Sequence, residues 1–165
     1  MPRRLSEINR KITHCYVVSI APCGLATQVE ITNKIPNQSY TSSKSKTPAS
    51  QSRPGGNGWQ ANKKNSDGTP AEPFIEIGLD NVKGMPNILL TQLLFDGNVD
   101  KMEIKFYQGD TQTGVRTART KDQPIQFQPA VSATKIRIYP VSTIQTDDVY
   151  SMTIVVFACP YGTFC

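Results

Sequence analysis

The fold is most constrained by the stretch from Thr134 to Cys159, where two alternating apolar runs are joined by a polar loop. Residues 136–139 read Ile-Arg-Ile-Tyr, which puts both isoleucines on one face of an extended chain. In the run that begins at Tyr150, apolar residues again recur at every second position, at Met152, Ile154 and Val156, and so share one face. This alternation predicts two half-buried strands. Proline donates no backbone hydrogen bond, so the first strand is expected to end before residue 140.

The same pattern recurs along the chain and favours an all-β domain. Further strands are expected over residues 72–79, 87–95, 101–107, 115–119 and 124–128, with a short edge strand over residues 16–20. Residues 36–72 are rich in Ser, Thr, Asn, Gly, Pro and Lys and are predicted to be mostly loop. No apolar run approaches the ~20 residues of a membrane-spanning helix. About eight strands separated by turns predict a single β-sandwich or jelly roll.

An ordered set of short motifs resembles the discoidin domain, the coagulation factor V/VIII C-type module. The matching segments are, in order, Cys23–Leu25, Tyr40–Ser43, Gly58–Ala61, Phe74–Leu79, Thr91–Gln92, Ile136–Pro140 and Met152–Cys159. The resemblance implies a galactose-binding-like jelly roll of antiparallel strands over residues 23–159. Residues 1–22 are then a flanking segment, and residues 160–165 begin a further cysteine-containing segment. Leu93 and Thr143 stand where the family usually has glycine and tryptophan, so no particular ligand is transferred.

The cysteines stand at the two ends of the chain, at positions 15, 23, 159 and 165. Their gaps are wider than those of zinc-binding pairs and His14 is the only histidine, so we expect no metal site, although spacing alone leaves a four-cysteine site open. The resemblance implies a disulfide between Cys23 and Cys159, and a closed loop of this length stabilises a fold by about 5 kcal/mol in a chain-entropy model. Cys15 and Cys165 are expected to pair with each other or to link neighbouring domains or subunits.

The resembled family is mostly non-catalytic, which implies an adhesion or recognition module that binds ligands through loops at one end of the barrel. The net charge is +5, and the basic residues gather in two groups. If both groups meet at one end, they are expected to attract glycans, sulphated polysaccharide or anionic cell surfaces; the alternative is an ordinary basic surface. The candidate ligand-binding residues are Lys44, Lys46, Arg53, Lys63 and Lys64 in the first group and Arg116 and Arg119 in the second.

Two other side chains are singled out within the predicted loop. Trp59 is the only tryptophan, and it either anchors the loop in the core or stacks on a ligand, with the anchoring role favoured. Asn37 begins an Asn-Gln-Ser sequon and is a candidate glycosylation site if the chain is secreted.

Three alternative modes of action follow from particular residues. Leu93, Leu94 and Phe95 would form an apolar tip for phospholipid binding if they lie in a loop, whereas a buried strand end is an equal alternative. The outer cysteines would support disulfide-linked homo-oligomers or assembly into a matrix, and a cell-surface or matrix protein is a further candidate partner. No nucleic-acid partner is expected, because the aromatic residues are not interleaved with the basic ones.

No catalytic constellation is found in the sequence, so no enzymatic activity is expected. Asp96, Asn98 and Asp100 have the spacing of weak Ca²⁺ ligands, but a plain turn is the favoured interpretation, and no other cofactor is expected. The N-terminus lacks the apolar core of a secretory signal. The implied disulfide nevertheless predicts an extracellular location, with the chain forming one module of a larger protein.

Overall fold

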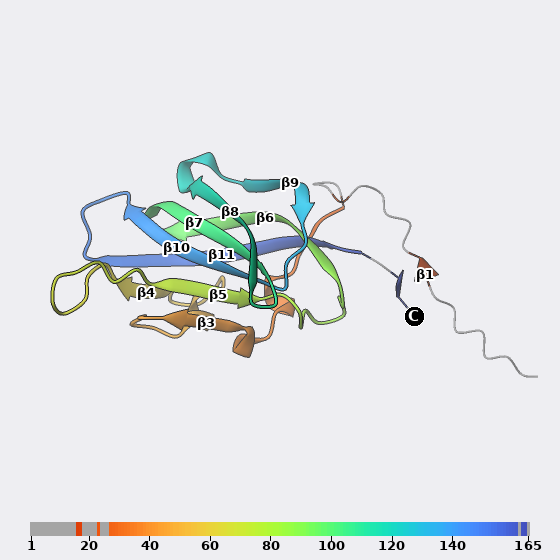
Figure 1. The fold of residues 1–165 in the computed structure, drawn as a ribbon, viewed down its shortest axis with the longest axis horizontal. Helices are drawn as coiled ribbons and strands as arrows, with labels where there is room; N and C mark the ends of the chain where they lie inside the picture. The colour runs from red at the N-terminus through yellow and green to blue at the C-terminus, as the bar shows by residue number, and fades with distance from the viewer. Residues whose placement is uncertain (1–15, 18–22, 24–26, 162, 165) are drawn as a thin grey trace, which may run out of the picture.

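The computed structural model describes residues 16–17, 23, 27–161 and 163–164, and its core is a sandwich of two antiparallel β-sheets (Figure 1). The first sheet has the strand order β3 (Tyr40–Ser43), β5 (Phe74–Gly78), β10 (Lys135–Thr143), β7 (Val99–Gln108) and β8 (Thr111–Arg119). The second has the order β2 (Val29–Glu30), β11 (Val149–Pro160), β6 (Ile88–Gly97) and β9 (Ile125–Val131), and β4 (Trp59–Asn62) also pairs with β11. The predicted all-β jelly-roll class is confirmed.

Short 3-10 turns and one small ladder complete the secondary structure. The 3-10 helices are η1 (Thr32–Lys34), η2 (Asn37–Ser39), η3 (Ala49–Ser52) and η4 (Thr120–Asp122). Outside the sandwich, β1 (Tyr16–Val17) pairs antiparallel with β12 (Thr163–Phe164). None of the helices in the described ranges is long and apolar enough to cross a membrane.

The alternation of β10 divides its residues between the core and the outer face. Ile136 and Ile138 are fully buried, and their antiparallel partners on the two sides are Ile77 and Ile75 of β5 and Phe106 and Ile104 of β7. The opposing sheet contributes Leu90, Leu93, Met152, Ile154 and Val156 to the same core. Burying such a side chain contributes roughly 2 kcal/mol, so the isoleucine pattern of the sequence accounts for the inner layer of the first sheet.

Pro140 does not end the strand as expected, since β10 continues to Thr143. The last pair between β10 and β5 is Ile138 with Ile75, so beyond this point β10 is paired only with β7. The register with β7 also shifts between Pro140 and Ser142. A one-sided, bulged segment tolerates proline, because fewer ladder hydrogen bonds require its missing N–H.

Residues 36–72 are more ordered than the loop predicted from their composition. Two short strands, β3 and β4, lie within them and complete one edge of each sheet. Trp59 and Ala61 of β4 are fully buried, and Tyr40 of β3 is 6% exposed. Strands of four residues that bury so few side chains give little periodic signal, which is why they were not predicted.

The other strand predictions are confirmed with changed limits. β8 begins at Thr111 and not at Val115, because the turn after β7 is confined to residues 109–110. β9 extends beyond Gln128 to Val131, and the described part of the predicted strand 16–20 is β1. Leu93 and Phe95 are buried within β6, at 0% and 6% exposure, so of the two alternatives for residues 93–95 the buried strand is confirmed and the apolar loop tip is excluded.

The disulfide between Cys23 and Cys159 is present, as the resemblance implied. It ties the last buried residue of β11 to a point 136 residues earlier in the chain. Cys15, Cys165 and most of the flanking segments lie outside the described residues. The domain limits of 23 and 159 therefore remain a prediction.

We predict a second disulfide between Cys15 and Cys165. The β1–β12 ladder pairs Tyr16 with Phe164, and in the sequence Cys15 precedes Tyr16 while Cys165 follows Phe164. Peptide mapping of the non-reduced, oxidised protein by mass spectrometry is expected to find the two cysteines linked within one chain. Free thiols at these positions, or a link between two chains, would contradict the prediction.

We also predict that Tyr40→Phe is tolerated at neutral pH and reduces alkaline unfolding. Burial raises the pKa of Tyr40 from 10.0 to about 12, against an opposing effect of Arg53, and its hydroxyl has no hydrogen-bond partner in the described part of the chain. The folded state therefore holds its proton more tightly, so the stability from the neutral phenol is present below pH 10 and lost as the pH rises towards 12. Denaturant titrations at neutral and alkaline pH measure the free energy of unfolding. At pH 7 the variant should match the unchanged protein or exceed it by up to about 1 kcal/mol. As the pH rises, the variant should lose less stability than the unchanged protein. A variant that is markedly less stable at pH 7 would show that the hydroxyl has a partner.

Candidate functional site

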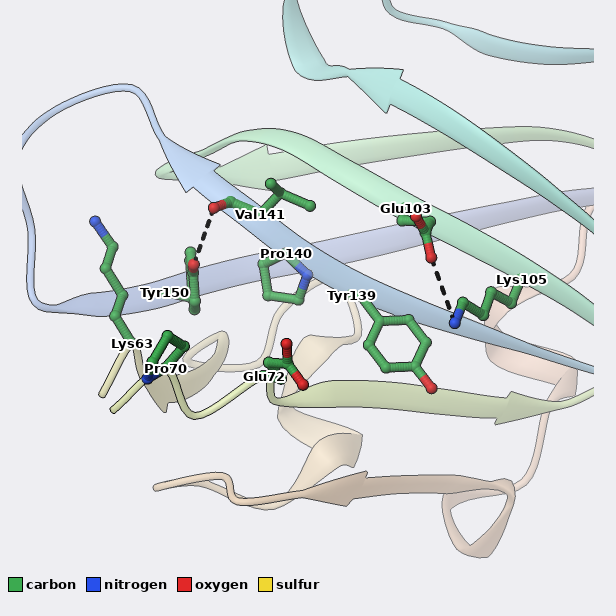
Figure 2. A pocket seen from close by; sticks show the side chains of 9 residues that line it. All are labelled: Lys63, Pro70, Glu72, Glu103, Lys105, Tyr139, Pro140, Val141 and Tyr150. Atoms are coloured by element: carbon green, nitrogen blue, oxygen red, sulfur yellow. Dashed lines mark hydrogen bonds and ion pairs between the residues drawn. The ribbon is translucent and has the colours of Figure 1, made fainter. Parts of the chain in front are cut away.

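A pocket of about 380 Å³ lies where the outer face of the first sheet meets the loop between β4 and β5 (Figure 2). β7, β10 and β11 supply one wall and the loop supplies the other. Figure 1 shows this loop near the one that joins β10 to β11. The residues lining the pocket are Lys63, Pro70, Glu72, Glu103, Lys105, Tyr139, Pro140, Val141 and Tyr150.

Tyr139 presents an aromatic surface to the pocket because it follows the two core isoleucines of β10 by alternation. Its ring is half-buried and its centroid lies 5.2 Å from that of Phe74 on β5, at an interplanar angle of 47°. The ammonium of Lys105 on β7 lies 4.7 Å from the centre of the same ring. A cation over an aromatic face is an attractive contact, so the ring is held in place by both neighbouring strands.

The lysines of the pocket are held by specific partners. Lys105 forms an ion pair with Glu103, with 3.4 Å between nitrogen and oxygen. Lys63 donates a hydrogen bond to the Thr143 hydroxyl and lies 5.5 Å from the centre of the Tyr150 ring. Both ammonium groups are therefore positioned before a ligand arrives.

Tyr150 closes one side of the pocket. Its hydroxyl donates to the Val141 carbonyl at 3.1 Å, and burial raises the pKa of this phenol. The group therefore stays protonated at neutral pH, and its hydrogen bond fixes the end of β10 against the start of β11.

Glu72 supplies a carboxylate that is free to bind a ligand. Its side chain is exposed and forms no hydrogen bond or ion pair with the residues that the structure describes. Its backbone has φ = 48°, in the left-handed region that side chains rarely adopt. Such strain costs about 1–3 kcal/mol and is concentrated at functional sites.

The arrangement suits a polyhydroxylated ligand. Carboxylates accept hydrogen bonds from hydroxyl groups and ammonium groups donate to them, while an aromatic ring packs against the apolar face of a ring-shaped ligand. Glu72, Lys105 and Tyr139 provide one group of each kind within one pocket. A concave site with a few convergent polar groups is the usual form of a small-ligand site.

Comparison with solved structures identifies the fold. The family 32 carbohydrate-binding module of C. perfringens NanJ, in complex with galactose, matches 79% of this chain and 98% of its own, with a TM-score of 0.51 and 16% identity. Discoidin II of Dictyostelium discoideum matches 84% of this chain and 61% of its own, with a TM-score of 0.58 and 14% identity. A Streptococcus pneumoniae fucose binding module matches 79% of this chain and 95% of its own, with a TM-score of 0.52 and 12% identity.

The chain has the discoidin, galactose-binding-like fold. No protein-family model matches the sequence, and no curated protein does. The resemblance read from the short motifs is therefore confirmed by the structure, at identities that establish the fold alone.

In this discoidin-like sandwich, the predicted basic residues do not form one site. Lys63 lines the pocket, whereas Lys44, Lys46 and Lys64 are exposed beside it on the loops around β4. Arg116 and Arg119 lie on β8, and β5, β10 and β7 separate that strand from β3. The condition that both groups meet at one end is not fulfilled, because β3 and β8 are the opposite edges of the sheet.

Arg53 has a structural role in place of the predicted ligand contact. Its guanidinium donates to the Thr32 carbonyl at 3.1 Å and to the side chain of Asn37, and it lies 5.6 Å from the centre of the Tyr40 ring. These contacts fasten η3 to the preceding turns. Asn37 itself is exposed, and its glycosylation remains a prediction.

Trp59 is fully buried, so its ring has no surface on which a ligand can stack. The anchoring role favoured for this residue is confirmed, and its inclusion among the ligand-binding residues is corrected. The pairing of Trp59 with Met152 of β11 carries its ring into the core.

Arg116 and Arg119 are engaged at the β8 edge. Arg116 donates to the Gln126 carbonyl and lies 5.2 Å from the centre of the Phe127 ring, while Arg119 pairs with Asp100 at 4.0 Å. Asn98 donates to the Val149 carbonyl at 2.8 Å and accepts from the backbone of Ser151. No cluster of three His, Cys, Asp or Glu side chains suited to a metal ion occurs in the described ranges, and Ca²⁺ binding at residues 96, 98 and 100 stays a prediction.

Sequence reasoning missed most residues of the pocket, chiefly Glu72, Lys105 and Tyr139. The alternation of residues 101–107 and 136–139 did assign Lys105 and Tyr139 to outward faces. It could not show that these faces adjoin in one sheet or that the β4–β5 loop folds over them. Glu72 carried no signal, because its backbone conformation is set by tertiary contacts.

We predict that Glu72→Gly stabilises the protein. Glycine adopts φ = 48° without steric cost, so the free energy of unfolding should rise by about 1 kcal/mol. Glu72→Gln keeps the strained backbone and should leave stability nearly unchanged. Urea denaturation of the two variants measures the difference, and a loss of stability in Glu72→Gly would show that the carboxylate has a structural partner.

Proposed function

We propose that the chain is a non-catalytic carbohydrate-binding module that holds a neutral sugar in the pocket between Tyr139 and Glu72. The observation that carries this proposal is that one pocket holds both a fixed aromatic ring and a carboxylate with no partner among the described residues. The ring would pack on the apolar face of a pyranose, and the carboxylate would accept hydrogen bonds from its hydroxyl groups.

The structural neighbours support a sugar ligand. The C. perfringens module was crystallised with galactose, and the S. pneumoniae module is described as fucose binding. Both have the fold of this chain, and both ligands are small sugars. Fold alone does not assign function, so the proposal depends on the pocket as well.

The charges of the pocket favour a neutral sugar over a sulphated one. Lys105 is paired with Glu103, and Glu72 adds a second carboxylate, so the site has no excess of positive charge. The exposed Lys44, Lys46 and Lys64 lie outside it and support only weak, salt-sensitive attraction of sulphated polysaccharide.

We infer an extracellular, adhesive setting from the disulfide. A bond between Cys23 and Cys159 persists in oxidising compartments, where modules that recognise cell-surface glycans act. Phospholipid binding has little support, because Leu93 and Phe95, two of the three residues of the alternative apolar tip, are buried in β6. Assembly into disulfide-linked multimers would need Cys15 and Cys165 to bond between chains, which the mapping above tests.

The proposal is tested on a glycan array that carries neutral and sulphated sugars, probed across a salt series. Saturable binding to a neutral sugar is expected to persist at high salt, and Tyr139→Ala should weaken it by about tenfold or more. Tyr161→Ala, a half-buried tyrosine outside the pocket, is the matched control. Binding only to sulphated sugars, lost as salt rises and unchanged in Tyr139→Ala, would overturn the proposal.

The strained residue provides a second test. Glu72→Gly should bind the neutral sugar more weakly although it folds more stably. Lys44→Gly relieves a similar strain, at φ = 50°, outside the pocket and should bind as the unchanged protein does. Equal binding by all three proteins would remove Glu72 from the site.

A further inference from the structure

The outer face of the first sheet carries a continuous row of planar and charged groups that extends beyond the pocket. From Tyr139 the row passes to Phe74, and the guanidinium of Arg137 lies 4.7 Å from the centre of the Phe74 ring and 5.0 Å from that of Tyr107. It ends at Lys135, whose ammonium is 5.5 Å from the centre of the Tyr107 ring. Each contact joins neighbouring strands, so the row crosses the face without a break.

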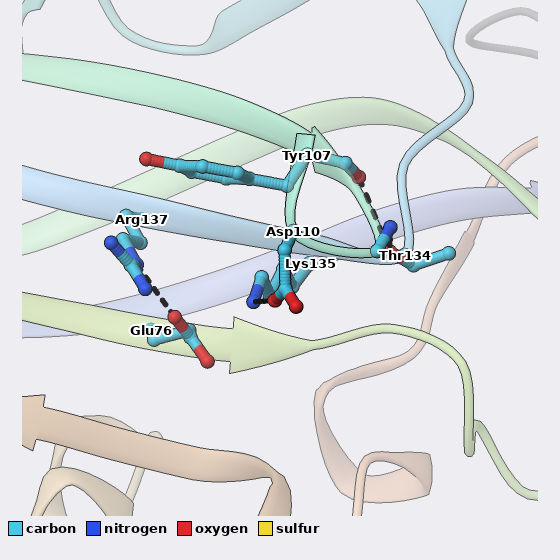
Figure 3. A network of polar contacts seen from close by, with 7 residues as sticks. Glu76, Tyr107, Asp110, Thr134, Lys135 and Arg137 are labelled. Atoms are coloured by element: carbon cyan, nitrogen blue, oxygen red, sulfur yellow. Dashed lines mark hydrogen bonds and ion pairs between the residues drawn. The ribbon is translucent and has the colours of Figure 1, made fainter. Parts of the chain in front are cut away.

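Ion pairs fix the charged members of this row (Figure 3). Arg137 donates to Glu76 at 2.6 Å, and Lys135 pairs with Asp110 at 3.0 Å. The hydrogen bond to Glu76 raises the pKa of Arg137, so its guanidinium remains charged. A surface that is already ordered loses little conformational entropy when a ligand binds to it.

A second hollow, of about 350 Å³, lies at the far end of the same face. Phe74 and Glu76 lie on the outward face of β5, and the next position on that face is Gly78, which has no side chain. Polar side chains from four separate segments surround this point, among them Gln38, Thr41, Glu76, Asp80, Asn81, Asp110 and Lys135. The hollow is therefore lined by hydrogen-bonding groups.

The two hollows lie along one strand. Tyr139 lines the first and Lys135 lines the second, and four residues of an antiparallel strand span about 14 Å. This is longer than a single pyranose ring. Arg137 and Phe74, both half-buried, lie between the two, and the Tyr107 ring beside Arg137 is only 8% exposed.

We propose that this face binds an extended neutral glycan chain, with one end in the Tyr139 pocket and the other in the hollow at Gly78. The inference rests on the proposed function and adds the class of ligand, an oligosaccharide in place of a single sugar. Cations and carboxylates alternate across the face, as in Lys105–Glu103, Arg137–Glu76 and Lys135–Asp110, so a chain of one charge would meet repulsion along its length. A neutral chain finds donors and acceptors at every step.

Affinity as a function of chain length tests the proposal. The probes are galactose and a graded series of galacto-oligosaccharides, measured by isothermal titration calorimetry at high salt. We expect affinity to rise by roughly tenfold from galactose to the chain that reaches the second hollow, and to level off beyond it. Equal affinity for galactose and for all its oligomers would overturn the inference while leaving the proposed function intact.

Variants of the second hollow separate the two sites. In Gly78→Thr the added Cβ would lie 3.4 Å from the Ser39 Cβ, an ordinary contact, and the side chain would occupy the hollow. This variant and Asn81→Ala should lose the gain from chain length and keep the affinity for galactose. Asn57→Ala, an exposed asparagine outside both hollows, is the matched control and should keep the gain.

The results of these experiments distinguish failure of the inference from failure of the proposed function. If Gly78→Thr and Asn81→Ala both keep the full gain, the second hollow does not hold the chain and the inference is wrong. If galactose and all neutral sugars on the array fail to bind the unchanged protein, the proposed function fails and the inference with it.

Discussion

The structure depends on the register of β10 between β5 and β7. Ile136 stands opposite Ile77 on one side and Phe106 on the other. Ile138, the next core residue of the strand, likewise stands between a residue of β5 and one of β7. A slip of one residue would exchange the faces of the strand and place Arg137 in the core. The burial of the isoleucines therefore fixes which side chains the outer face presents, and the proposed binding surface follows from the packing beneath it.

The side chains of the outer face are held in position by contacts with side chains of the neighbouring strands. Because Arg137 is held between two aromatic rings and hydrogen-bonded to Glu76, its long side chain is ordered without a ligand. Lys105 is ordered in the same way over Tyr139. Partly exposed pairs of this kind add little to stability. Their main effect is to hold the charged groups and the rings of the outer face in fixed positions.

The β4–β5 loop contributes a group that is held by no such contact among the described residues. The β4–β5 loop places Glu72 across from Tyr139 in a strained backbone conformation, without a partner among the residues that the structure describes. On the other side of the pocket, β10 and β11 are joined by the hydrogen bond from Tyr150 to Val141. Rigid strands and one strained loop residue together give the site its shape.

The sequence predicted the parts of this arrangement that depend on period two, namely the strands with Ile136 and Ile138 inside and Arg137 and Tyr139 outside. The motif order also gave the fold and the bond between Cys23 and Cys159. The site was not predicted, because the density of lysines in residues 36–72 marks a solvated loop, whereas the pocket is made by residues distant in sequence. The core position favoured for Trp59 is confirmed, since pairing with β11 buries the ring.

The most direct test is to map the ligand contact by amide chemical-shift perturbation on isotope-labelled protein titrated with a neutral galacto-oligosaccharide. The account predicts that the shifted resonances belong to outward residues of β7 and β10 and to the β4–β5 loop, including Lys105, Tyr139 and Glu72. Shifts confined to Lys44 and Lys46, or to Arg116 and Arg119 on β8, would contradict it and return the binding site to the basic surface.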